Sequence, residues 1–477
     1  MTNSALNRSG CLLLAIWLSP LLMAEPVREP FVPNHVAVED VILSSPNGNA
    51  RGRLARGTLV AAREMDDVLD VKTEKGGFGL AHRRSFSRLG SSIQITEETR
   101  TAAESSNQFA FDLHRQLRTR EGNLFYSPAS VWTALAMTCA GARGTTRREM
   151  ATVLHLDAPR DVEPGISSLL DVLNSTGDRN GYSLATANRL WGAADYAFET
   201  DFLHRTRATY RAELKTLDFT QPEPARRTIN RWTADQTRGK IVDLIPPGIL
   251  EPDTRLVLTN AIYFAGGWSF EFPKSATKLA PFFLSRSQRI EVPTMEQRRE
   301  LPYAEDEEAQ VLALPYRDHE LSLIVILPRS RGGLGHLEAQ LTHQRFQDWV
   351  RGLRTEHLVE VYLPKFTLRS DFLLSEVLGA AGLKSAFSAD ADFSGISRQE
   401  ALMISEVVHQ AFVDVDEAGT EAAAATAVVM APTAAIAEPG PPPKPVIFRA
   451  DHPFLLAIRD DRSGAVLFLA RVQRPVE

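Results

Sequence analysis

Residues 416–426 constrain the fold more than any other stretch, because their local propensity conflicts with their surroundings. Four consecutive alanines are among the best helix formers, whereas the residues just before them, 411–416, alternate like a strand. Apart from Glu421, every side chain from Thr420 to Thr426 is small, so the stretch cannot anchor a core. Taken alone, it fits an exposed helix or linker, or an unusual strand.

An extended conformation would give this stretch two different faces. Glu421 marks one of them as the face toward water, which it shares with Ala423, Ala425 and Ala427. The opposite face carries Thr420, Ala422, Ala424, Thr426, Val428 and Met430. Because the side chains are small on both faces, such a segment could enter a β-sheet between two strands without steric obstruction.

Composition excludes several classes of protein. The chain has 477 residues, of which 44% are hydrophobic and 23% charged, enough for one large domain and a smaller one. The formal net charge of −6, with arginines scattered along the chain, gives no reason to expect a nucleic-acid partner or a polyanionic cofactor. We therefore expect a protein that binds neither.

The first residues, 1–24, are typical of a secretory signal peptide. Arg8 precedes the apolar run 11–18, and cleavage after Ala24 would release the mature chain to the extracellular space or the periplasm. An uncleaved membrane anchor is the alternative, although the run is short for a full span. Cys139 would then be the single mature cysteine, so stability must come from packing and not from a disulfide.

Two regions with different hydrophobic patterns follow. Residues 25–98 contain short alternating segments separated by turn formers, which favours a small β-rich module. They resemble bacterial SH3-like domains, and a loosely folded leader is the alternative. Residues 99–477 place helical patterns first and most β-branched strand candidates later, which predicts a mixed α+β domain.

Five segments of the larger region resemble the serpin family, whose members inhibit serine proteases by inserting a reactive loop into their own sheet. They occur in family order over roughly 330 residues and are residues 123–130, 259–268, 363–366, 391–397 and 450–454. Together with the stretch after residue 416, they identify the chain as similar to a bacterial-type inhibitory serpin with an N-terminal extension.

The resemblance implies a fold and a set of site residues. It implies a large mixed central sheet, smaller sheets, eight or nine helices, and an exposed reactive loop at about residues 417–445 that lies outside the sheet before cleavage. A hydrogen-bonded cluster that opens the sheet would consist of Ser127, Ser130, Asn260 and His409. Lys365 and Glu417 would form an ion pair at the top of the sheet, where Trp268 should also pack. The hinge would comprise Glu417, Gly419, Thr420, Glu421, Ala422, Ala423, Ala424, Ala425 and Thr426.

The same resemblance implies that the protein is a monomer and that it acts by suicide inhibition. The loop is offered as substrate, the protease forms a covalent acyl complex, and the freed arm inserts as a new strand. Counting fourteen residues after Gly419 places the reactive bond between Thr433 and Ala434. No Lys or Arg occurs between Arg398 and Lys444, so we expect elastase-like or subtilisin-like serine proteases as targets, with cysteine proteases as a second class. A non-inhibitory serpin acting as chaperone, carrier or storage protein is the alternative.

Motifs of catalysis and metal binding are missing from the sequence. It contains no G-x-S-x-G, no H-E-x-x-H, no C-x-x-C and no G-x-x-x-x-G-K. We therefore expect a protein that is not an enzyme and that has neither a metal site nor a cofactor.

Overall fold

The chain of the computed structural model divides into two compact units, Met1–Ser91 and Ser92–Glu477. The structure describes residues 95–156, 163–174, 182–399, 402–420 and 444–476, and before residue 92 it describes the backbone of seven strands. The predicted signal segment, residues 1–24, lies outside the described residues.

The first unit contains one antiparallel sheet with the strand order β3-β2-β6-β5-β4-β1-β7. Its strands are β1 (His35–Ala37), β2 (Val41–Ser44), β3 (Ala50–Leu54), β4 (Leu59–Met65), β5 (Val68–Thr73), β6 (Phe78–His82) and β7 (Phe86–Arg88). The likeness to SH3-like domains stays a prediction.

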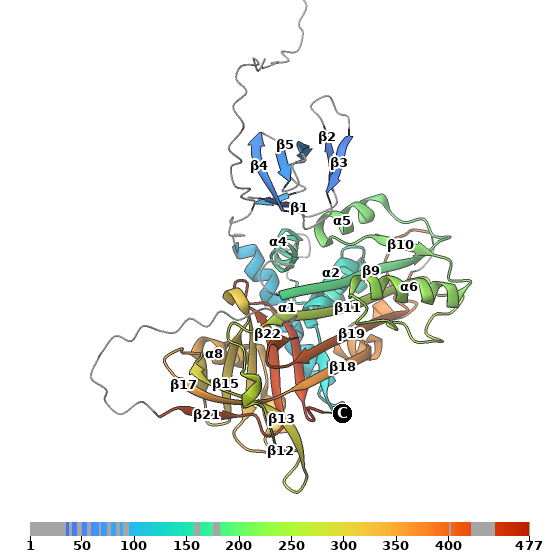
Figure 1. The fold of residues 1–477 in the computed structure, drawn as a ribbon. Helices are drawn as coiled ribbons and strands as arrows, with labels where there is room; N and C mark the ends of the chain where they lie inside the picture. Colours follow the sequence, from blue (N-terminus) through green and yellow to red (C-terminus); the bar gives the residue numbers. More distant parts are fainter. Residues whose placement is uncertain are drawn as a thin grey trace, which may run out of the picture. The chain divides into compact units, whose positions relative to one another are not determined.

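The second unit is built around a six-stranded central sheet (Figure 1). In order, its strands are β10 (Leu214–Leu217), β9 (Tyr182–Ala193), β11 (Leu256–Gly267), β20 (Gly419–Thr420), β19 (Glu406–Val415) and β18 (Phe366–Leu373). β11 and β19 run parallel to each other, whereas the two-residue strand β20 is antiparallel to both. The sheet is therefore mixed, as predicted.

Two further sheets complete the second unit. The four-stranded one contains β12 (Lys278–Phe283), β13 (Arg289–Glu300), β17 (Leu358–Pro364) and β21 (Val446–Arg449). The six-stranded one contains β14 (Tyr303–Glu305), β15 (Ala309–Pro315), β16 (Leu321–Pro328), β22 (Phe454–Asp460), β23 (Val466–Val472) and β8 (Leu124–Tyr126).

Nine α-helices occur in the described residues, within the predicted number. They are α1 (Glu97–Leu117), α2 (Pro128–Cys139), α3 (Gly144–Val153), α4 (Glu163–Asn174), α5 (Thr200–Tyr210), α6 (Pro222–Gln236), α7 (Leu334–Gln340), α8 (His343–Gly352) and α9 (Ser375–Ala381). None of the helices in these ranges is both long and apolar enough to cross a membrane.

Helix α2 begins with a capped first turn. Ser127 is the N-cap, its hydroxyl accepts the backbone N–H of Ser130, and Pro128 occupies the first turn, where a missing N–H costs nothing. All twelve residues of the helix are buried. The helix contacts β11 of the central sheet and β23 of the other six-stranded sheet, so it positions its polar first turn beneath the central strands (Figure 1).

Candidate functional site

A buried polar cluster crosses the pair of parallel strands β11 and β19. Asn260 and His409 lie directly opposite each other in the register, and His409 Nδ1 donates to Asn260 Oδ1. Asn260 Nδ2 donates to Ser130 Oγ at 2.6 Å and to Asn188 Oδ1 at 2.7 Å. Ser130 Oγ in turn donates to Asn188 Oδ1 at 2.9 Å. Four side chains from four elements are thus joined in one network.

The first turn of α2 also bonds to this cluster. The backbone N–H of Ser127 donates to His409 Nε2 at 2.9 Å, and its hydroxyl donates to the carbonyl of Leu467 at 2.6 Å. The structure therefore brings Ser127, Ser130, Asn260 and His409 together. Their role in opening the sheet stays a prediction. Asn188 on β9 was missed, although an asparagine in the middle of a strand was a signal that could have found it.

His409 is held in one uncharged tautomer. Its side chain is fully buried, and burial lowers the pKa of His409 to about 3. Because Nε2 accepts the N–H of Ser127, the ring proton resides on Nδ1, where it is donated to Asn260. The cluster therefore depends on a neutral imidazole.

This burial predicts a loss of stability in acid. The folded-state pKa of His409 lies below the value of about 6.5 in an unfolded chain, so the unfolded state binds more protons between the two values. The contribution of neutral His409 to the free energy of unfolding is complete above about pH 6.5 and is lost as the pH falls toward 3. We expect the free energy of unfolding to drop by about 2 kcal/mol between pH 7 and pH 5 from this residue.

Chemical denaturation at the two pH values measures the effect in His409→Gln. The matched control is His204→Gln, because His204 is exposed on α5. The first variant should lose much of the pH dependence, and the control should keep it. Equal pH dependence in both variants would contradict the assignment.

The chain turns sharply after β19, and Asp416 organises the turn. Asp416 Oδ1 accepts the backbone N–H groups of Ala418 at 2.8 Å and Gly419 at 3.2 Å, while the N–H of Asp416 donates to the carbonyl of Gly419 at 2.8 Å. Gly419 has a φ of +156°, and a Cβ there would lie 2.1 Å from the carbonyl oxygen of Gly266. Only glycine permits this approach of β20 to β11.

Residues that follow β11 hold the same turn from the other side. The backbone N–H of Trp268 donates to the carbonyl of Ala418 at 3.0 Å, and its indole Nε1 donates to the carbonyl of Asp416 at 2.9 Å. The N–H of Phe272 donates to the carbonyl of Glu417 at 2.9 Å. The structure thus places Trp268 against the turn that follows β19.

Glu417 and Lys365 form an ion pair beside this turn. Lys365 Nζ lies 2.8 Å from Glu417 Oε2, and Thr277 Oγ1 donates to Glu417 Oε1 at 2.8 Å. Burial acts to raise the pKa of Glu417, but the hydrogen bonds from Lys365 and Thr277 outweigh it and lower that pKa. The Lys365 side chain is 36% exposed and that of Glu417 only 8%. Because Glu417 is buried and doubly hydrogen-bonded, loss of Lys365 would leave a buried carboxylate short of one partner.

Thr420 is already part of the central sheet. It lies opposite Gly266 of β11 and Val415 of β19, and it is fully buried. The expectation that the loop lies outside the sheet before cleavage is therefore wrong for Gly419 and Thr420. The turn at Asp416 is so tight that the chain re-enters the sheet at once.

The other predicted hinge residues after Thr420 and both residues of the predicted reactive bond fall outside the described residues. These are the hinge positions Glu421, Ala422, Ala423, Ala424, Ala425 and Thr426 and the reactive-bond positions Thr433 and Ala434. Within the described ranges, no group of three His, Cys, Asp or Glu side chains could hold a metal ion.

A family model described as Serpin (serine protease inhibitor) matches residues 104–475. The chain belongs to the serpin family. Leukocyte elastase inhibitor of Sus scrofa is 40% identical to this serpin over 380 residues, which cover 78% of this chain and 98% of that protein.

Solved structures share the fold of this serpin. Serpin48 of the insect Tenebrio molitor is 32% identical, with a TM-score of 0.69 over 78% of this chain and 98% of that chain. Uncleaved ovalbumin is 31% identical, with a TM-score of 0.70 over 78% of this chain and all of that chain.

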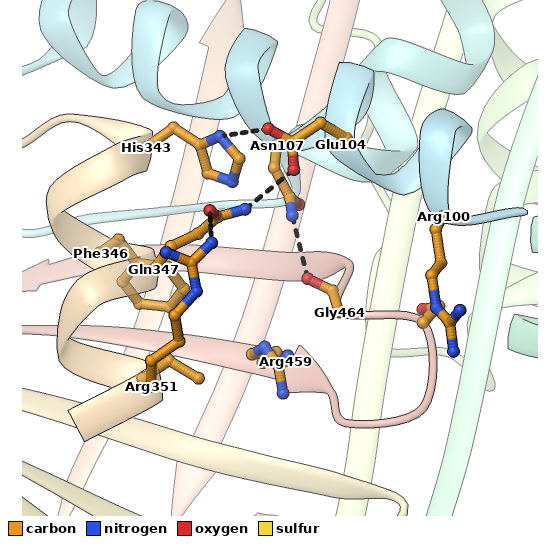
Figure 2. A pocket seen from close by; sticks show the side chains of 11 residues that line it. Arg100, Glu104, Asn107, His343, Phe346, Gln347, Arg351, Arg459 and Gly464 are labelled. Atoms are coloured by element: carbon orange, nitrogen blue, oxygen red, sulfur yellow. Dashed lines mark hydrogen bonds and ion pairs between the residues drawn. The ribbon is translucent and has the colours of Figure 1, made fainter. Parts of the chain in front are cut away.

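This serpin also has a cavity of about 240 Å³ between α1, α8 and the turn after β22. Figure 2 shows bonds among several residues that line it: His343 Nδ1 lies 3.1 Å from Glu104, Gln347 donates to Glu104 at 2.8 Å, and Asn107 donates to the backbone carbonyl of Gly464 at 2.9 Å. Pockets for small molecules usually enclose roughly 300–1,000 Å³. This cavity is smaller than the range, but a second one of about 590 Å³, lined by residues that include Gly122, Leu334 and Arg474, lies within it. Cavity size therefore does not decide between a carrier and an inhibitor.

Proposed function

We propose that this serpin inhibits a serine protease of the elastase-like or subtilisin-like class by suicide-substrate loop insertion. The protease cleaves near Thr433 and Ala434 and forms its acyl-enzyme. The freed arm then inserts between β11 and β19 before the acyl bond is hydrolysed. Cysteine proteases are a second class that the same chemistry could trap.

One observation carries the proposal: β20 lies between the parallel strands β11 and β19 and is antiparallel to both. An arm that continues β20 would separate the parallel pair and replace it with two antiparallel pairings. Antiparallel pairing is slightly more stable per residue. Each inserted residue adds ladder hydrogen bonds worth about 0.5–1.5 kcal/mol net. An arm of about a dozen residues therefore supplies on the order of ten kcal/mol for trapping the protease.

The strand register supports the same proposal. Thr420 lies opposite Gly266 and Val415. Six residues further along the arm is Thr426, and six residues back along the two strands are Asn260 and His409. An inserted Thr426 would therefore lie between Asn260 and His409, on the face of Thr420. Its hydroxyl could then bond to both side chains once the strands have parted.

The target class follows from the bait residues and is supported by the relatives. Ala431, Thr433, Ala434 and Ala435 fit shallow apolar pockets, and a leukocyte elastase inhibitor is among the similar proteins.

Incubation with elastase tests the function directly. We expect a covalent complex that survives hot SDS and a released carboxy-terminal fragment that begins near Ala434 by intact-mass analysis. A cleaved protein without any such complex, with elastase and with subtilisin, would favour the non-inhibitory alternative. A fragment that begins at Pro445 or beyond would contradict the proposed reactive bond.

We also propose that residues 1–24 direct the monomeric protein out of the cell. Cys139 is compatible with this location, because it is free and buried, and burial raises the pKa of its thiol to about 11. A protonated, inaccessible thiol resists oxidation. The intact mass of protein recovered outside the cell should correspond to a chain that begins at Glu25, and retention of the full chain inside would refute the proposal.

A further inference from the structure

Strands β11 and β19 are already separated at the end of the central sheet where β20 lies. The parallel pairing of β11 with β19 runs from Val257 and Glu406 as far as Tyr263 and Phe412. Beyond this point the next described pairing of β11 on that side is with β20, at Gly266. The two strands have thus separated before Gly266 is reached.

Tyr316 holds the first docked side chain in this gap. Its hydroxyl lies 2.7 Å from Thr420 Oγ1, and both side chains are fully buried. The ring is stacked on Trp268 at 4.8 Å between centroids and meets the edge of Phe264 at 4.9 Å. Because the ring is fixed on both sides, the hydroxyl cannot follow Thr420 if β20 leaves the sheet.

We propose that Tyr316 is a positioning residue for loop insertion, because its hydrogen bond keeps Thr420 docked between β11 and β19 in the uncleaved protein. This inference rests on the proposed function. Insertion after cleavage then begins in a sheet that is already parted. The docked hinge thereby decides how often the acyl-enzyme is trapped and how often it is hydrolysed.

Loss of the phenolic hydroxyl should favour an undocked hinge. Without the Tyr316 hydroxyl, the docked Thr420 hydroxyl is buried and has lost its partner. After β20 leaves the sheet, water can bond to the Thr420 hydroxyl. The net worth of one hydrogen bond corresponds to a shift of about two- to tenfold in the ratio of undocked to docked protein.

Tyr316→Phe tests the inference through two readouts. Amide hydrogen exchange in the peptide that covers residues 416–420 should become about two- to tenfold faster. The ratio of cleaved to trapped protein in the reaction with elastase should rise by a similar factor, with cleavage at the same bond. The matched control is Tyr210→Phe, which removes another buried hydroxyl, bonded at 3.1 Å to the carbonyl of Ala136 and far from the hinge. It should change neither readout.

Substitutions of the partner residue separate the hydrogen bond from packing. Thr420→Ser retains the hydroxyl and should behave like the unchanged protein, whereas Thr420→Val should match Tyr316→Phe. The double variant should show a smaller effect than either single change, because it leaves no buried hydroxyl without a partner.

The outcomes of these experiments are distinguishable. A covalent complex with an unchanged ratio of cleaved to trapped protein in Tyr316→Phe and Thr420→Val would refute the inference and leave the proposed function standing. Unchanged hydrogen exchange would refute it as well. If the unchanged protein forms no covalent complex, the proposed function fails and the inference fails with it.

Discussion

Ala422→Arg should convert this serpin from an inhibitor into a substrate. If the arm inserts in the register of Thr420, Ala422 would lie opposite Phe264 and Val413, which are both fully buried. A guanidinium without a partner in that position costs several kcal/mol at the start of insertion. At about 1.4 kcal/mol for each tenfold change, insertion would slow by about a hundredfold or more relative to hydrolysis. Electrophoresis in SDS should then show cleaved protein and almost no complex.

Glu421→Arg is the matched control for this variant. In the inserted arm, Glu421 would precede Ala422, lie opposite Asp414 and point to the other face of the sheet. That face is at the surface, where the Asp414 side chain bonds to Thr367. The new cation would stay hydrated beside a carboxylate, so trapping should change by less than about twofold. Both variants should keep the thermal midpoint of the uncleaved protein. If Ala422→Arg still forms as much complex as Glu421→Arg, the arm does not insert in this register.

Asn260→Ala should destabilise the uncleaved protein and let the central strands part. The substitution leaves His409 Nδ1 without its acceptor and removes the donor to Ser130 and Asn188, all within the sheet. Buried groups left unsatisfied should lower the free energy of unfolding by about 2–4 kcal/mol. Because parted strands expose two unpaired edges, other copies of the chain can add strands there. We expect oligomers on size-exclusion chromatography after mild warming.

Asn230→Ala separates this effect from a general loss of stability. Asn230 is buried on α6 and makes two hydrogen bonds to the backbone of Ile245, at 3.0 and 2.8 Å, away from the parting strands. It should lower the thermal midpoint by a comparable amount without forming oligomers under the same conditions. Oligomers in equal amount from both variants would show that unfolding alone causes them.

The order of elements, with helical patterns first and most β-branched strand candidates later, determined the mixed α+β fold from the sequence alone. The family and four residues of the polar cluster, Ser127, Ser130, Asn260 and His409, were predicted only through the resemblance of five segments to serpins. The positions of Trp268, Lys365 and Glu417 at one end of the sheet were also predicted, through the resemblance, and the structure brings them together.

Only the tertiary structure decided the partners of these residues. Asn188 bonds to Asn260 from 72 positions away, Thr277 to Glu417 from 140, and Tyr316 to Thr420 from 104. No local period encodes such pairs, because strand register and the packing of neighbouring sheets set them. The docking of Thr420 is of the same kind. The sequence showed that the Thr420 side chain is small enough to enter a sheet. Three tertiary features place it there: the tight turn at Asp416, the close approach of Gly419 to Gly266, and the fixed hydroxyl of Tyr316.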